Sequence, residues 1–180
     1  MWPWGHLAVG YLALAGGRRA PPGGAGTLLL ALGTQFPDLV DKPLAWHLGV
    51  IPNARSLAHS AIVATLLVTI VWWYAARRDQ RPLALAFGVG YASHLTADAL
   101  YPALAGDVVD LAFLGWPVLP AIEYTGSTSV TARFAELFAT LAAGQVPGTL
   151  AFEVGLTLVA VALWARHGFP GLGPLRRLGR

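Results

Sequence analysis

The chain has 180 residues, of which 56% are hydrophobic and only 12% charged, and its mean hydropathy is positive. Soluble domains carry roughly 25% charged residues, so this composition indicates a protein embedded in lipid. The length excludes a separate soluble enzyme beside the membrane part, and the absence of Cys excludes disulfides and thiolate metal ligands. We expect one integral membrane domain whose chemistry uses oxygen and imidazole groups.

The first two apolar segments, residues 4–17 and 26–36, are shorter than the ~17–25 residues of a free-standing span. A stretch rich in Pro and Gly separates them, and Pro37 is predicted to end the second. We expect two short helices packed inside a bundle. No basic residues precede the first segment, so we expect it to stay in the mature protein.

Three later segments, residues 56–77, 82–101 and 149–166, have the length of a membrane span. Ser56 is a plausible N-cap of the first, and Pro82 suits the opening turn of the second. Residues 129–143 have apolar side chains at helical spacing, which predicts an amphipathic helix on the membrane or capping the bundle. The fold class is therefore all-α: a polytopic bundle of about four or five transmembrane helices plus an amphipathic helix on the outer side.

Charge predicts the orientation of this bundle. If the segments alternate in direction, nine of the twelve basic residues fall on one side: Arg18, Arg19, Arg77, Arg78, Arg81, Arg166, Arg176, Arg177 and Arg180. The positive-inside rule makes that side, with the C-terminus, cytoplasmic in a multi-pass protein of the inner or plasma membrane. Topology and anionic lipid explain these arginines at span ends, so we expect no nucleic-acid partner.

Histidine and aspartate residues near predicted helix ends would converge on the outer side of the membrane. They are His6, Asp38, His59, His94 and Asp98. The spacing of His94 and Asp98 puts them on one face of a helix, where they could bind one cation or only hydrogen-bond each other. Ionisable groups inside membrane spans are costly and are functional candidates by default. Imidazole with carboxylate suits a divalent metal, with Zn favoured and Mn or Fe possible, as one ion or two.

Two further side chains extend the site toward catalysis. Arg55 could hold a phosphate or carboxylate at the N-terminus of the third segment, or it could bind lipid headgroups, Asp38 or Asp41 instead. Asp41 is a candidate base or second-metal ligand. We expect segments one and three to point their N-termini at the site, and segments two and four their C-termini. A metal, a carboxylate and an anion clamp together indicate metal-assisted hydrolysis.

These residues resemble the YdjM-like, LexA-regulated, membrane-bound metal-dependent hydrolases. The resemblance covers roughly residues 5–102 and rests on four motifs in order: Gly5-His6, Pro37-Asp38 with Asp41, Arg55 with His59-Ser60, and His94 with Asp98. That family is distantly similar to zinc-dependent phospholipases C and single-strand nucleases, which implies His6, Asp38, His59, His94 and Asp98 as metal ligands. The chain departs from the family's usual Pro-Asp-x-Asp, and it lacks the further HxxxE of the phospholipases, for which lone Glu153 is no substitute.

We accordingly divide the single domain of residues 1–180 into three parts. Residues 1–102 form the metal-site core, 103–147 the outer loop and amphipathic helix, and 148–180 the last transmembrane helix and a basic cytoplasmic tail. His47, on the outer loop, is interpreted as an exposed histidine outside the site.

The hypothesis is a hydrolase acting at the outer membrane face, among membrane lipids, on an amphipathic or phosphate-containing substrate. The alternative is a non-enzymatic membrane protein with a structural metal, or an ion or proton carrier. Between Asp98 and Arg81, at the start of the fourth segment, His94 is the one charged or histidine residue, which favours a one-sided pocket over a carrier.

Overall fold

The structure is a computed structural model that describes residues 1–16, 22–122 and 129–173. This part contains six α-helices, one 3-10 helix and no strand, which confirms the all-α expectation. The elements are α1 (Pro3–Ala15), α2 (Gly24–Trp46), α3 (Ala61–Ala76), α4 (Arg81–Ala105), η1 (Ala112–Gly115), α5 (Val130–Ala142) and α6 (Gly148–Arg166). Outside the described residues lie Arg18, Arg19, Arg176, Arg177, Arg180 and Glu123.

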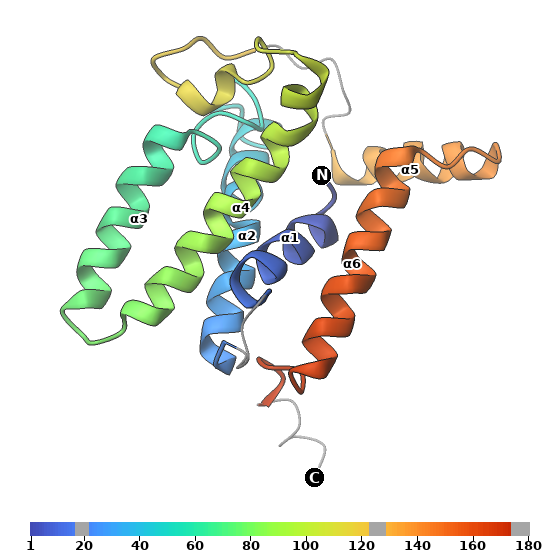
Figure 1. Ribbon diagram of the computed structural model, residues 1–180. Coiled ribbons are helices and arrows are strands. Elements are labelled where there is room, and N and C mark those ends of the chain that lie inside the picture. Colours follow the sequence, from blue (N-terminus) through green and yellow to red (C-terminus); the bar gives the residue numbers. More distant parts are fainter. Residues whose placement is uncertain (17–21, 123–128, 174–180) are drawn as a thin grey trace.

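Helices α2 and α4 form the centre of the bundle. They pack against each other most extensively, α3 packs on α4, and α1 lies against α2, α4 and α6. Helix α6 runs along the outside, while α5 projects sideways from the end of the bundle where α6 begins (Figure 1). That end also holds the N-terminus and η1, and the α3–α4 turn lies at the opposite end (Figure 1).

Two glycines let the central helices touch backbone to backbone. A Cβ on Gly33 would lie 2.2 Å from the carbonyl oxygen of Phe87, and one on Gly90 would lie 2.3 Å from that of Leu30. Real Cβ atoms do not approach oxygen so closely, so neither position accepts a side chain without separating the helices. This approach sets the spacing between the helix that carries Asp38 and the helix that carries His94 and Asp98.

We expect Gly90→Ala to lower the free energy of unfolding by about 1–3 kcal/mol or more, because the added methyl overpacks the α2–α4 contact. Gly155→Ala on α6 is the matched control. A Cβ there meets no atom within 4 Å, so we expect no loss and up to about 1 kcal/mol of gain from helix propensity. Denaturant unfolding in detergent measures both, and equal stability of the two variants would contradict the close approach.

The predicted end of the second segment at Pro37 is wrong. Helix α2 continues through Pro37 and Pro43 to Trp46, so Asp38 lies within a helix and not at its end. Proline removes one backbone hydrogen bond and crowds the preceding turn. Packing offsets this loss, because Pro37 is almost completely buried in the bundle. Helix α4 likewise passes Pro102 and ends at Ala105, where Gly106 adopts a left-handed conformation.

The third segment begins later than predicted. Ser60 is the N-cap of α3, and its hydroxyl accepts hydrogen bonds from the N–H groups of Ile62 and Val63. Ser56 instead donates its hydroxyl to the carbonyl of Asn53, inside a loop. His59 therefore sits in the loop just before α3. The expectation that the second and fourth segments end at the site is also wrong, since α2 and α4 both extend past it.

Helix α6 is the one described helix that is both long and apolar enough to cross a membrane. Only 11% of its most apolar stretch is buried, which distinguishes it from the core helix of a soluble protein. The apolar helix α3 has 16 residues and is shorter than a typical span. Polar residues within α2 and α4, among them Asp38 and His94, keep these longer helices from matching the composition of a span. The number of four or five spans is thus not confirmed.

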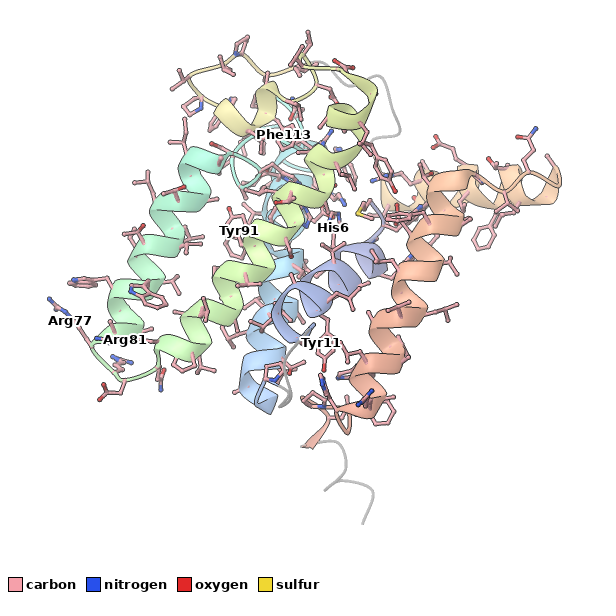
Figure 2. All side chains as sticks on the ribbon, viewed as in Figure 1. His6, Tyr11, Arg77, Arg81, Tyr91 and Phe113 are labelled. Carbon is pink, nitrogen blue, oxygen red and sulfur yellow. The ribbon has the colours of Figure 1, made fainter. Side chains whose placement is uncertain are left out.

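The predicted amphipathic helix is confirmed as α5, none of whose residues is fully buried. Phe134 contacts Trp2, with ring centroids 5.0 Å apart, so α5 lies against the N-terminus. At the other end of the bundle the guanidinium of Arg77 lies 3.8 Å from the ring centre of Trp73. Figure 2 shows Arg77 and Arg81 at the end remote from Phe113. The described basic span ends and the His/Asp cluster therefore lie at opposite ends.

Candidate metal centre

The five predicted ligands come together although they lie on four different segments. His6 is in the first turns of α1, Asp38 in α2, His59 in the loop before α3, and His94 and Asp98 in α4. Two overlapping groups could hold a metal ion: His6 with His94 and Asp98, and Asp38 with His59 and His94. His94 is common to both groups. Each of the three imidazoles is at most 1% exposed.

The two central imidazoles face each other with their Nε2 atoms 3.1 Å apart. His94 donates its Nδ1–H to the carbonyl oxygen of Thr34 at 2.6 Å, and His59 donates its Nδ1–H to Asp41 at 2.8 Å. Both partners only accept, so in a neutral imidazole the lone pair is on Nε2. Two facing lone pairs repel unless a cation lies beside them. The site is therefore arranged for positive charge.

The two carboxylates flank this pair of nitrogens. Nε2 of His59 lies 3.6 Å from Oδ1 of Asp38 and 3.6 Å from Oδ2 of Asp98. Nε2 of His94 lies 4.0 Å and 3.7 Å from the same two oxygens. Tetrahedral zinc with bonds of ~2.0–2.1 Å holds its ligand atoms about 3.3 Å apart. The donor types and separations therefore fit a divalent metal after a small contraction.

Burial opposes protonation of His59, but hydrogen bonds to Asp38 and Asp41 and the nearby charge of Asp98 outweigh it and raise the pKa of His59. The imidazole thus lies in a negative local field. This field would attract a divalent cation as it attracts a proton. The metal and the proton compete for the same nitrogen, because Nδ1 is already bound.

The imidazole of His6 lies beside the second carboxylate oxygen of Asp98. Its Nε2 lies 3.3 Å from Oδ1 of Asp98, and its ring stacks on His94 with centroids 3.8 Å apart. The N-terminal amine of Met1 lies 3.0 Å from the same oxygen. Nδ1 of His6 is buried with no hydrogen-bond partner among the described residues. Asp98 thus has one oxygen toward His59 and His94 and the other toward His6, as a bridging carboxylate would.

Asp41 is in contact with His59 and not with the other candidate ligands. It is fully buried, and its carboxylate accepts from the backbone N–H groups of Ser56, Ala58 and His59 at 2.8–3.2 Å and from the His59 ring. Four donors occupy the two oxygens, so little capacity remains to bind a metal or take a proton from water. The geometry favours a role in orienting His59 over the predicted base.

Arg55 lies over the site and pairs with Asp98 and Asp110. Its Nη2 donates to the backbone carbonyl of Asp98 at 2.9 Å, its Nε lies 3.6 Å from Oδ2 of Asp98, and its Nη1 lies 3.5 Å from Asp110. The guanidinium also stacks over Phe113, 4.3 Å from the ring centre. These acidic partners differ from Asp38 and Asp41, which the sequence had suggested. Lys42, one turn beyond Asp38, pairs with that carboxylate.

The centre opens toward the end of the bundle that carries the loops. The side chains of Asp98, Asp38 and Arg55 are 10%, 13% and 22% exposed, whereas the imidazoles behind them are closed off. His47 is exposed at the end of α2 and takes no part, as expected. His167 is hydrogen-bonded to Tyr11 far along the bundle. Solvent thus reaches the carboxylates of Asp38 and Asp98 and the guanidinium of Arg55, but not the imidazoles.

Sequence reasoning missed two groups that shape this centre. The carbonyl of Thr34 sets the tautomer of His94, and no sequence pattern reveals a backbone acceptor from another helix. Lys42 could have been found, because its spacing from Asp38 is that of a helical ion pair. The assumption that α2 ended at Pro37 hid it.

Comparison with known proteins gives one match. A family model described as YdjM inner membrane protein matches residues 1–168. No curated protein and no solved structure gave a significant match. The family match covers all five candidate ligands and extends well beyond residues 5–102, on which the resemblance of the sequence motifs rested.

Proposed function

The chain belongs to the YdjM inner membrane protein family, and on that premise we propose that it is a membrane-bound, metal-dependent hydrolase acting on phosphoesters or other anionic lipid-like substrates. The observation that supports it best is the pair of His59 and His94 nitrogens, fixed by their Nδ1 partners and flanked by two partly exposed carboxylates. A structural metal needs no such opening, whereas a catalytic one keeps an accessible position.

His59, His94, Asp38 and Asp98 would hold the metal, with His6 at the second oxygen of Asp98. Zinc is the ion that suits these donors best. A divalent metal there supplies a Lewis acid and lowers the pKa of water toward about 7. The protein fixes the donor geometry through Thr34 and Asp41 and admits substrate only from the loop end.

Two cations beside the opening favour an anionic substrate. Arg55 and Lys42 are partly exposed and lie on either side of the carboxylates. A guanidinium matches the oxygens of a phosphate and stabilises negative charge that grows during attack on phosphorus. Arg55 is held by Asp110 and Phe113, so it is already oriented before a substrate arrives.

We further propose that the protein crosses the membrane several times, with the metal centre on the extracytoplasmic side. The arginines of the α3–α4 turn and Arg166 of α6 lie at the end opposite the metal centre, which the positive-inside rule makes cytoplasmic. Exposed apolar side chains on α3 and α6, such as Leu66 and Leu158, both above 60% exposed, suit contact with lipid chains.

Zinc-loaded protein in detergent tests the hydrolase proposal on p-nitrophenyl phosphate monoesters and diesters. We expect Arg55→Gln to keep its metal and to lose about a hundredfold or more in kcat/KM, because one donor to the developing charge is removed. Arg81→Gln, at the other end of the bundle, is the control and should retain full activity. Fully loaded wild-type protein that hydrolyses neither these esters nor phospholipid would contradict the proposal and leave a structural metal.

A further inference from the structure

An apolar groove of about 300 Å³ runs between α1, α2 and α6, on the side of α1 away from His94. Its walls include Leu7 of α1, Leu28 of α2 and Val161 of α6. It extends from Trp4, near the loop end of the bundle, to Trp164 and Leu172 beyond the middle of α6. The metal centre lies on the other face of α1, so the groove is a separate feature.

Nearly every polar atom on the side chains that line this groove is already bound within the protein. The Tyr11 hydroxyl is bonded to His167, the Thr157 hydroxyl donates to the carbonyl of Glu153, and the Trp164 indole donates to the carbonyl of Pro170. The Thr27 hydroxyl donates to carbonyls at the start of α2. A ligand therefore meets an apolar wall along most of the groove.

Trp4 is the exception. Its indole Nε1–H is buried and has no acceptor among the described residues. A buried donor without a partner costs about 1–3 kcal/mol, so an acceptor from outside the chain would be favourable. The side chain with this unpaired donor lines one end of the groove, and apolar surface lines the rest.

The surroundings of the groove suit an apolar occupant. One wall is α6, which has the length and composition of a membrane span and exposes most of its apolar surface. The chain belongs to an inner membrane family. An open apolar groove in a bilayer fills with the apolar chains around it, because water is excluded there. Apolar walls with a single unpaired donor at one end match an acyl chain joined to an ester carbonyl.

We propose that this groove binds one acyl chain of an ester-linked membrane lipid, with the ester carbonyl accepting from the Trp4 indole. Trp4 precedes His6 by two residues, so the headgroup of this lipid would lie at the level of the metal centre. The binding does not depend on hydrolysis. It can hold whether or not the metal centre is catalytic.

Photolabelling in vesicles of phosphatidylethanolamine and phosphatidylglycerol tests this proposal. The probe is phosphatidylglycerol with a diazirine on the acyl chain, made with either an ester or an ether linkage, and labelled peptides are mapped by mass spectrometry. We expect groove residues such as Leu7 and Leu28 to be labelled more strongly than the exposed Leu66 and Ile70 of α3. The ester probe should label them severalfold more than the ether probe, since the ether lacks the carbonyl.

Variants separate the groove from general lipid contact. Trp4→Phe should abolish the preference for the ester probe, while Trp73→Phe on exposed α3 keeps it. Val161→Trp fills the groove and should remove most labelling of Leu28. Val159→Trp is the control: this residue is exposed and does not line the groove, so the labelling of Leu28 should remain. If the groove residues Leu7 and Leu28 were labelled no more strongly than the exposed residues Leu66 and Ile70 of α3, the proposal would be overturned. Equal labelling by both probes in the wild type would overturn the assignment of Trp4 to an ester.

Asp98→Ala keeps this test distinct from that of the hydrolase. The substitution removes a metal ligand candidate but no groove residue, so labelling of Leu7 and Leu28 should persist in it. Loss of labelling in Asp98→Ala, with the protein still folded, would mean that the lipid is held by the metal centre and not by the groove.

Discussion

His94→Ala is expected to abolish metal binding. His94 belongs to both groups of candidate ligands, so no group of three remains intact when its imidazole is removed. Its Nε2 lies within 3.1–4.0 Å of His59, Asp38 and Asp98, so the substitution removes a donor that lies beside each of these three ligands. Elemental analysis of purified protein should show one or two equivalents of zinc, or of manganese or iron, in the wild type and background levels in the variant.

Two controls make this result specific to the centre. His167→Ala removes a histidine that binds Tyr11 at the other end of the bundle, and it should keep the full metal content. His6→Ala removes the ligand nearest the second oxygen of Asp98 only, so it should keep the ion between His59 and His94. Metal at the wild-type level in folded His94→Ala protein would contradict the site and the hydrolase proposal with it.

The sequence could predict that the five ligands converge, because this depends only on the direction in which each helix runs through the bundle. Alternating helices bring residues near the start of one segment beside residues near the end of the next. That holds even though the predicted ends of α2 and α4 were wrong, since Asp38 and Asp98 keep their level in the bundle when the helices continue past them. Helix ends depend on tertiary packing, which buried Pro37 inside a helix that the local sequence would end.

The contacts that orient the ligands were not predictable in the same way. Thr34 acts on His94 through its backbone carbonyl, and the two residues are 60 positions apart in the chain. This hydrogen bond between Thr34 and His94 depends on the distance between α2 and α4, which Gly33 and Gly90 set by direct backbone contact. Arg55 paired with Asp98 and Asp110 for a similar reason, because η1 and its loop fold over the site and carry Asp110 to it.

The second large effect is expected at Asp41, which separates orientation of a ligand from catalysis. Asp41→Ala would leave three backbone N–H groups and the His59 ring without an acceptor in a fully buried position. Breaking a buried charge network in this way costs about 3–5 kcal/mol, so the free energy of unfolding should fall by that amount. Denaturant unfolding of the metal-free protein measures it.

Asp41→Asn isolates the effect on the metal. Asparagine keeps the volume and one acceptor oxygen, but it cannot accept all four bonds and lacks the negative charge behind His59. We expect metal affinity to fall about 10–100-fold with a smaller loss of stability, as for other partners that orient a ligating histidine. Asp79→Asn, at the exposed α3–α4 turn, should leave both quantities unchanged.

The pattern across these two variants decides what Asp41 does. A base that acts on water would leave metal affinity near the wild-type value in Asp41→Asn while activity disappears. A residue that orients His59 lowers affinity and activity together. The four N–H donors on its carboxylate favour the second outcome, because they occupy both oxygens and the side chain is fully buried. Asp41 would then hold the loop before α3 in place and orient His59 toward the metal centre.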